Sequence, residues 1–564
     1  MWGPGKDLLR LMCSMMLPFA AYAAPGAEGQ AFHLDSRAGD DANDGLSPAT
    51  AWRTLEKASS RTYQSGERLL LRKGCVFQGK LLLRASGSAQ QPVIVEAYDG
   101  ADRNASLPVI DAKGFLAGAQ LVDCEHVEVS HLEITADAGE PKEPEAGPKR
   151  FGVLVSASAG AERRHIHLRS LRIHDIFATT QVALKGKNAT SNKAVGIEFT
   201  SEGGDGAFLS DILIEGCEIE RTGFTGIGIH SSNQDPARYH NGIRILNNTL
   251  RDIGGPGIQP GGCRNVLVRA NLVDRSGSSV DERMHGRGSG IWPWTCNDML
   301  IERNAFLHAR GKADSCGAHI DFNCSNVVVQ HNLSLDNEGG FVEILGNCRN
   351  CSYRYNVSIN DGFRVKGKNG AQQEGKTLWL SSYTGRGNKR TGPFNSYIYN
   401  NTVFVKADIR AAFSAAPTTD GALVANNIFC IQGQTANVGD DQEKGRKLDG
   451  PAIRNVIWSN NIITAELPGG VFTENSNAIA DDPKFRNAGG LDPADYAPTN
   501  PAAVKGRGVA ISKLPGDETG IAIGLEVETD YFGNRIAEGP PDLGAIVFGG
   551  KTTGLPPIGA AGMR

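Results

Sequence analysis

Asp321 and Glu343 are the two carboxylates of this sequence that are best spaced to act as a catalytic pair. They lie 22 residues apart, in the segments AHIDFN and FVEIL. If 22 residues form one turn of a fold built from stacked strands, the two backbones lie about 5 Å apart. Carboxyl groups about 5–5.5 Å apart are typical of a retaining glycosidase, in which one attacks the sugar and the other transfers a proton. Two close negative charges also raise one of the two pKa values, as a general acid at neutral pH requires.

Further side chains that could recognise a sugar alternate with apolar residues in the neighbouring segments. The apolar residues, which we expect to point inward, are Ile197, Ile258, Ile291, Ile320, Val342 and either Val365 or Phe363. Their neighbours then point outward on one face, where tryptophans offer flat apolar platforms for sugar rings. We therefore predict a substrate-binding set that consists of Glu198, His230, Gln259, Trp292, Trp294, His319, Asn323, Arg364, Lys366 and Trp379.

Each of these residues also has an ordinary structural explanation. Two carboxylates on a solvated strand face can be surface residues, and histidines often lie in loops. Trp292 and Trp294 can equally be covered by an inserted loop. The insertion SVDERMHGRGSG lies near the same cleft, so its Asp281, Glu282 or His285 is an alternative source of a subsite or of the acid.

The elements that must position these residues follow a repeat. Four segments align without gaps, and each runs from a Cys to an Asn eight residues later: 263–271, 296–304, 324–332 and 348–356. The Asn position continues at Asn248, Asn401, Asn427 and Asn461, with successive spacings between 23 and 45 residues. Apolar and polar residues alternate within each segment, as in a strand, and Gly and Asn join the segments in place of helices. We therefore predict an all-β fold, a right-handed parallel β-helix with a cap at each end.

The repeated Asn and Cys residues are expected to be structural. Asn tolerates a left-handed backbone at a corner between strands, and its amide can bond to the next coil. The Cys column, with its neighbour Cys351, is expected to fill the core as small apolar side chains, and free thiols are favoured. The alternative is that at least one pair of these cysteines forms a disulfide, because stacked coils lie within bridging distance. Zinc is not expected there, because no two Cys-x-x-Cys pairs face each other.

The chain divides into a leader, the solenoid and two capped ends. Residues 1–24 are typical of a signal peptide, with Lys6 and Arg10 before an apolar run and an Ala-Tyr-Ala cleavage site. Residues 25–114 are expected to form the N-terminal cap and first coils, with a short helix at 54–58. Residues 115–480 are expected to form the core with the cleft, and residues 481–564 the C-terminal coils and cap, because open strand edges aggregate.

The charge balance and the predicted leader limit the partners. The chain has 58 Lys and Arg against 62 Asp and Glu, a net charge of −4, which gives no reason to expect nucleic acid or an anionic membrane as a partner. No stretch after the leader has 18 uninterrupted apolar residues, so we expect no membrane span. We predict a secreted or periplasmic protein.

Both ends resemble those of bacterial right-handed parallel β-helix enzymes, a group of glycoside hydrolases and polysaccharide lyases. The segments that carry the resemblance are AGDDANDGLSPATAWRTLEKA near the N-terminus and DYFGNR and PDLGAI near the C-terminus. The resemblance implies this fold over nearly the whole mature chain. The pair Asp321 and Glu343 also resembles the arrangement in β-xylosidases of glycoside hydrolase family 120, which implies an Asp nucleophile and a Glu acid/base.

Three functions are compatible with these features. We favour a retaining glycoside hydrolase that acts on a polysaccharide or oligosaccharide through Asp321 and Glu343. A polysaccharide lyase or uronate epimerase would need a base and a positive charge beside the substrate carboxylate, for which Arg364 and Lys366 are candidates. A non-catalytic surface binder would use the tryptophans alone. We expect no metal in the site and no cofactor, with Ca²⁺ as an open option, and we expect a monomer.

Overall fold

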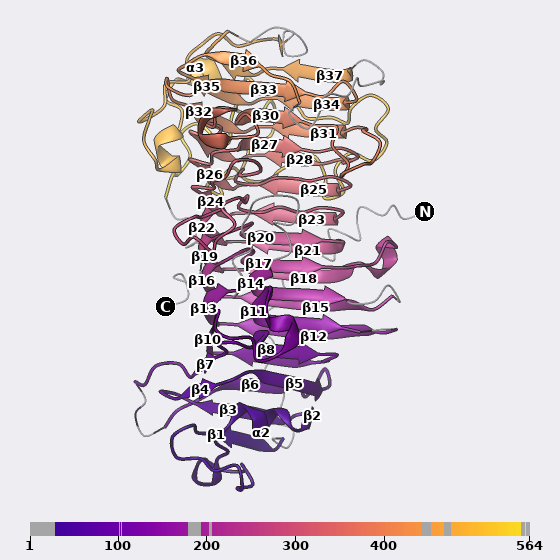
Figure 1. Ribbon diagram of the computed structural model, residues 1–564. Helices are drawn as coiled ribbons and strands as arrows, with labels where there is room; N and C mark the ends of the chain where they lie inside the picture. Colours follow the sequence, from indigo (N-terminus) through magenta and orange to yellow (C-terminus); the bar gives the residue numbers. More distant parts are fainter. Residues whose placement is uncertain are drawn as a thin grey trace.

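The structure is a computed structural model that describes residues 29–100, 102, 104–158, 160–178, 193–201, 206–440, 453–466, 475–553 and 559. The predicted signal peptide, residues 1–24, lies outside the described residues. The strands stack into one elongated column that rises from β1 to β37 (Figure 1). Successive strands of a coil belong to different sheets, and each pairs in parallel with a strand one coil away. This arrangement confirms the predicted all-β parallel β-helix.

Three faces make up the solenoid. The first face is a 15-stranded sheet, the second is a 13-stranded sheet, and the third is divided into a seven-stranded and a four-stranded sheet. Strands on the third face stop between residues 262 and 339, where isolated parallel bridges replace them: Ile258 with Ile291, Ile291 with Ala318, and Ile320 with Ile344. The third face therefore continues through this gap without regular strands.

The first sheet contains β1 (Ala31–Leu34), β3 (Arg68–Arg72), β6 (Val93–Tyr98), β9 (Val127–Ser130), β12 (Glu162–Arg169), β15 (Phe208–Glu215), β18 (His240–Leu246), β21 (Cys263–Arg269), β23 (Asn297–Glu302), β25 (Ser325–Gln330), β28 (Ser352–Arg354), β31 (Phe394–Tyr399), β34 (Asp420–Ala425), β37 (Arg454–Ser459) and β39 (Asn475–Ser476). The second contains β4 (Val76–Gln78), β7 (Val109–Asp111), β10 (Glu133–Asp137), β13 (Arg172–Phe177), β16 (Glu218–Thr222), β19 (Thr249–Ile253), β22 (Leu272–Ser276), β24 (Ala305–Leu307), β26 (Leu333–Leu335), β29 (Val357–Ile359), β32 (Thr402–Val405), β35 (Ile428–Ile431) and β38 (Ile462–Ile463). The third face contains β2 (Thr62–Gln64), β5 (Leu81–Ser86), β8 (Ala117–Val122), β11 (Lys149–Ala157), β14 (Lys193–Ser201), β17 (Ile227–His230) and β20 (Ile258–Gly261), followed by β27 (Gly340–Ile344), β30 (Lys376–Leu380), β33 (Ala411–Ala415) and β36 (Thr435–Asn437).

A ladder of buried asparagines crosses the coils. Asn304 accepts two hydrogen bonds at 2.9 Å on its Oδ1, one from the backbone N–H and one from the Nδ2 of Asn271, and Asn332 does the same for Asn304. The predicted amide bonds between coils are thus confirmed. The predicted left-handed backbone is wrong for the ladder residues, because positive φ falls one residue earlier, as at Arg303 (54°) and His331 (55°). The residue before each ladder Asn makes the corner between two strands, and the Asn side chain that follows it points into the core.

Core packing accounts for the cysteines. Ten cysteines lie in the described part of the chain, and all of them are unpaired. Cys263, Cys296, Cys324, Cys348 and Cys351 are at most 1% exposed and belong to one continuous apolar cluster. The structure thus has free stacked thiols in place of the disulfide that the sequence left open.

A short helix lies near the start of the solenoid, and the C-terminal segment packs on the outside of its coils. Thr54 caps the helix α2 (Leu55–Ser59), which confirms the short helix predicted near the N-terminus. From residue 481 the chain leaves the coils and includes the 3₁₀ turn η6 (Pro493–Tyr496) and the helix α3 (Pro501–Val504). It then packs along the outside of the first sheet, where the Tyr399 hydroxyl donates to the Leu525 carbonyl. Among the described residues, no helix has the length and apolar character needed to span a membrane.

Candidate active site

The predicted site lies in the gap of the third face, between β20 and β27. Pro260 and Pro293 occupy neighbouring rungs here, since Gly261 bridges to Trp294. Proline has no backbone N–H, so a rung that contains it cannot complete a regular ladder. Single bridges keep the apolar residues inward: Ile258, Ile291 and Ile320 are fully buried. The intervening side chains are thereby directed to the outer face.

The register across the gap differs from the prediction by two residues. Ile320 pairs with Ile344, and Cys316 pairs with Gly340, so a coil here has 24 residues. Glu343 consequently lies beside His319, whereas Asp321 is one pleat further along. The prediction that Asp321 stacks directly on Glu343 is wrong. Its cause is the assumed 22-residue coil, although Cys324 and Cys348 in the same sequence are 24 residues apart.

The two carboxyl groups still meet around one imidazole. His319 Nε2 lies 3.5 Å from Glu343 Oε1 and 4.0 Å from Asp321 Oδ1. These two oxygens can therefore be no more than 7.5 Å apart, the sum of the two distances. This limit admits both the separation of about 5–5.5 Å found in retaining glycosidases and the shorter part of the range found in inverting ones.

Asp321 is held by two N–H donors. Trp292 Nε1 donates to Asp321 Oδ2 at 2.6 Å, and the backbone N–H of Phe322 donates to Oδ1 at 2.8 Å. Burial raises the pKa of Asp321 to about 7, and the two hydrogen bonds oppose the rise because they stabilise the charged form. Asp321 can thus change protonation state near neutral pH.

Glu343 lies deeper and has a different donor. Its side chain is 1% exposed, and the Cys316 thiol donates to Oε2 at 2.8 Å, while Oε1 has no hydrogen-bond partner. Burial raises the pKa of Glu343 to about 7. Burial lowers the pKa of His319 to about 3, with a further contribution from the positive charge of Arg287, so the ring between the carboxyls is neutral.

A third carboxylate, which the sequence interpretation missed, joins this group. Asp314 forms an ion pair with Arg287, and Asp314, His319 and Glu343 each offer one polar atom within 4.8 Å of the others. Such a set of carboxylates and an imidazole can hold a divalent cation as well as sugar hydroxyls. Asp314 lies in an irregular segment outside the alternating pattern, so no spacing indicated it. Arg287 comes from the insertion that was considered for Asp281, Glu282 and His285.

Aromatic rings lie beside the cluster formed by Asp314, Asp321 and Glu343. Trp292 stacks on His319 with 5.1 Å between centroids and 19° between planes, and Trp294 lies 6.2 Å from His230 and 6.3 Å from Phe322. A Cβ on Gly261 would lie 2.3 Å from the Trp294 indole, so only glycine lets this ring lie flat on the rung below. Both tryptophans are half-buried, which suits them to stack against sugar rings.

Glu198, His230 and Gln259 continue the same face away from the carboxyls. Glu198 Oε1 lies 2.9 Å from His230 Nδ1, and its buried Oε2 has no hydrogen-bond partner. That oxygen occupies the space that a Cβ on Gly228 would fill, at 2.1 Å. Gln259 pairs with Gly228 on one rung, and the next rung brings Trp292. Glu198 and Gln259 thus lie in the row that leads through Trp292 to His319, whereas His230 lies two residues further along, in the row of Gly261 and Trp294.

Four predicted binding residues are placed elsewhere. Residues 362–375 form an insertion and do not continue the third face. Within it, Lys366 is exposed, whereas Arg364 is buried beside Asp314, where it donates to the Ala313 carbonyl and the Ser315 hydroxyl. Of the two inward candidates, Val365 is 50% exposed, and Phe363 packs against the core. Trp379 does follow Glu343 on the next rung, but it is 2% exposed and covered by Lys376, whose Nζ lies 3.7 Å from the ring centroid. Asn323 lies at a corner, where it accepts a hydrogen bond from Asn347.

Comparisons with known proteins agree with this fold. Residues 174–403 match a family model described as a right handed beta helix region. The chain is 26% identical, over 642 aligned positions, to a lacto-N-biosidase from Bifidobacterium longum subsp. longum. The alignment covers 94% of this chain and 38% of that protein, so the chain spans little more than a third of the length of this relative.

Solved structures with a similar course of the chain include two carbohydrate-related proteins. A GH136 lacto-N-biosidase from Eubacterium ramulus is 23% identical with a TM-score of 0.48, over 70% of this chain and 67% of that chain. XylC in complex with xylose is 10% identical with a TM-score of 0.47, over 92% of this chain and 98% of that chain. The chain is a right-handed parallel β-helix protein that resembles a lacto-N-biosidase in sequence along nearly all of its own length.

Proposed function

We propose that this chain is an exported glycoside hydrolase that cleaves an oligosaccharide with retention of anomeric configuration. The observation that carries the proposal is the pair of buried carboxyls, Asp321 and Glu343, on the two sides of a neutral His319. Carboxyls that hold a proton near neutral pH are what acid-catalysed cleavage of a glycoside requires. The similarity to a lacto-N-biosidase supports the reaction class and makes a lacto-N-bioside the first substrate to test.

Asp321 is the proposed nucleophile because two N–H donors stabilise its anion. Its carboxylate oxygen forms a bond to the anomeric carbon as the glycosidic C–O bond breaks. Glu343 gives its proton to the departing oxygen in the same step. Glu343 then takes a proton from water, whose oxygen attacks the anomeric carbon and releases Asp321.

Asp314 is the alternative partner of Asp321. Its ion pair with Arg287 places a positive charge beside an ionised carboxylate, as a nucleophile needs. In that arrangement Asp321 would transfer the proton, and Glu343 would position His319. The reaction class is the same in both arrangements, but the residue that carries the covalent sugar differs.

The lyase alternative has less support than it had from sequence. Arg364 and Lys366 were its candidate base and positive charge. Arg364 donates to the Ala313 carbonyl and the Ser315 hydroxyl on either side of Asp314, so it supplies positive charge near Glu343 but cannot act as a base, and Lys366 is exposed. A non-catalytic binder would need the tryptophans without the carboxyls. Activity measurements separate these alternatives from hydrolysis.

The test compares the wild type with Asp321→Asn, Glu343→Gln and Asp314→Asn on a chromogenic lacto-N-bioside and a panel of oligosaccharides. Asp361→Asn is the matched control, because Asp361 is also a buried carboxyl with a pKa of about 7 but is bonded to Ser358 and Asn337.

We expect new reducing ends without an unsaturated product, a loss of about 10³-fold or more in the first two variants, and near wild-type activity in the control. An active Glu343→Gln with an inactive Asp314→Asn would move the role to Asp314. An unsaturated sugar product would establish a lyase. If the wild type turned over none of the substrates, the non-catalytic carbohydrate-binding protein would be the remaining alternative.

A further inference from the structure

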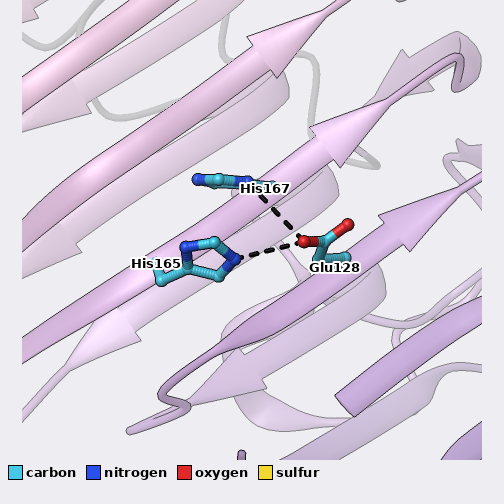
Figure 2. Close-up of side chains that lie close together, drawn as sticks. All are labelled: Glu128, His165 and His167. Atoms are coloured by element: carbon cyan, nitrogen blue, oxygen red, sulfur yellow. Dashed lines mark hydrogen bonds and ion pairs between the residues drawn. The ribbon is translucent and has the colours of Figure 1, made fainter. Parts of the chain in front are cut away.

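A cluster of histidines and carboxylates lies on the first sheet, away from the third face that carries the candidate active site. Glu128 comes from β9, His165 and His167 from β12, and Asp211 from β15. Figure 2 shows both imidazole rings next to the carboxylate of Glu128. Side-chain exposure is 30% for Glu128, 22% for His165 and 6% for His167, so the cluster is open to solvent on one side.

Three donor atoms converge in this cluster. His165 Nε2 lies 3.1 Å and His167 Nδ1 lies 3.9 Å from the same oxygen, Glu128 Oε1. All three atoms lie within 4.8 Å of one another. Tetrahedral zinc, with bonds of about 2.0–2.2 Å to nitrogen and oxygen, separates its ligand atoms by about 3.3 Å. The two distances to Glu128 Oε1, 3.1 and 3.9 Å, lie on either side of this value, and the two nitrogens are at most 4.8 Å apart, so side-chain shifts would have to close the site.

Asp211 fixes the orientation of both rings. His165 Nδ1 lies 2.9 Å from Asp211 Oδ2, and His167 Nε2 lies 3.3 Å from Asp211 Oδ1. An ionised carboxylate can only accept, so His165 donates to Asp211 through Nδ1 and His167 donates to it through Nε2. His165 Nε2 donates to Glu128 Oε1 in the same way, and a bound ion would take the place of this proton. A carboxylate that orients metal-binding imidazoles in this way is a regular feature of zinc sites.

The neighbouring arginines fit the same assignment. Arg169 donates from Nη1 to Glu128 Oε2 at 2.7 Å, which leaves Oε1 for the cluster. Its Nη2 lies 3.1 Å from His167 Nδ1, and because a guanidinium can only donate, that nitrogen carries a lone pair. Arg244 pairs with Asp211 at 2.6 Å, so two guanidinium charges balance two carboxylates. An incoming ion must displace the contact between Arg169 and His167 Nδ1 and the proton that His165 Nε2 shares with Glu128 Oε1.

We propose that Glu128, His165 and His167 bind a divalent ion of the zinc type, with Asp211 holding the two rings. Two imidazoles and one carboxylate are a common ligand set for zinc, and water completes the fourth position. The ion would link β9 to β12 directly and β15 through Asp211, three successive coils of the first sheet. Its role is therefore structural and separate from the hydrolase proposed above.

The experiment uses the untagged protein after removal of metal with a chelator. Zinc chloride is titrated by calorimetry, the bound metal is counted by elemental analysis, and thermal unfolding is followed with and without zinc. The variants are His165→Gln, Glu128→Gln and Asp211→Asn. His308→Gln is the matched control, because His308 is a half-exposed histidine that contacts one carboxylate, Asp274, at 2.8 Å.

We expect His165→Gln and Glu128→Gln each to lose one equivalent of bound zinc and the zinc-dependent rise in unfolding temperature. Asp211→Asn should weaken binding about 10–100-fold, as expected for a residue that orients the ligands. The control should bind like the wild type. Retention of that equivalent by both ligand variants, or no zinc bound by the wild type, would overturn the proposal. Glycosidase activity is not part of this readout, so the two proposals fail independently.

Discussion

Removal of the hydrogen bond from Trp292 to Asp321 should change the pKa of the proposed nucleophile. Trp292→Phe keeps an aromatic ring against His319 but removes the N–H that lies 2.6 Å from Asp321 Oδ2. A hydrogen bond to a charged group contributes about 1.5–3 kcal/mol, which corresponds to about one to two pH units in a pKa. Because the lost bond stabilised the anion, the pKa of Asp321 should rise from its value of about 7.

The assay is the pH dependence of kcat/KM on a chromogenic substrate. The ionised Asp321 is the reactive form, so the acid limb of the profile should move to higher pH by about one to two units in Trp292→Phe. Trp294→Phe is the control, since this indole contacts His230 and Phe322. An acid limb that stays in place in Trp292→Phe, or that moves equally in the control, would refute this assignment of Asp321.

Further predictions concern stability and substrate binding. Because the buried carboxyls of Asp321 and Glu343 have folded-state pKa values of about 7, above ordinary values near 4, the folded state binds more protons between about pH 4 and 7 and its stability falls as pH rises through this window. At pH 8 the wild type must bury charged carboxylates, whereas Asp321→Asn and Glu343→Gln stay neutral, so both variants should unfold at a higher temperature than the wild type at pH 8 but not at pH 4. Calorimetry that shows no difference at pH 8 would argue against the raised pKa values of these carboxyls. Asn332→Ala breaks the ladder and should cost about 2–4 kcal/mol of unfolding free energy in denaturant titrations; a loss below about 1 kcal/mol would mean that the ladder contributes little. Gly261→Ala places a Cβ 2.3 Å from the Trp294 ring and should raise KM by up to about tenfold with little change in kcat, whereas an unchanged KM would exclude Trp294 from substrate contact.

The repeat made the fold predictable. Asn304 and Asn332 occupy equivalent positions in stacked coils, and their hydrogen bonds are those expected for such a ladder. Ile258 and Ile291 alternate with outward residues, as two-residue periodicity requires. The residue with left-handed backbone was predicted one position too late. The repeat shows where the Asn side chain recurs in each coil, but it does not show which residue of the corner has a positive φ.

The site was predictable only in part, because register depends on coil length and on insertions. The 22-residue interval suggested that Asp321 stacks on Glu343, whereas the bridges place His319 in that position. Arg364 was wrongly assigned to the third face, because an insertion resembles a strand when it contains alternating apolar residues. Arg287 and Asp314 meet only through tertiary folding, since both lie in segments without regular secondary structure. No local pattern links such residues.

The most direct test of the central claim is reactivation of the carboxylate variants by sodium azide. If Asp321 is the nucleophile and Glu343 the acid/base, azide should restore turnover of an activated aryl glycoside in both Asp321→Gly and Glu343→Ala. Asp321→Gly should yield the glycosyl azide of inverted configuration, and Glu343→Ala the azide of retained configuration, as proton NMR can establish. The assignment would be contradicted if the two variants gave the opposite configurations. It would also be contradicted if azide restored turnover in Asp314→Gly, with a glycosyl azide of inverted configuration, but not in Asp321→Gly.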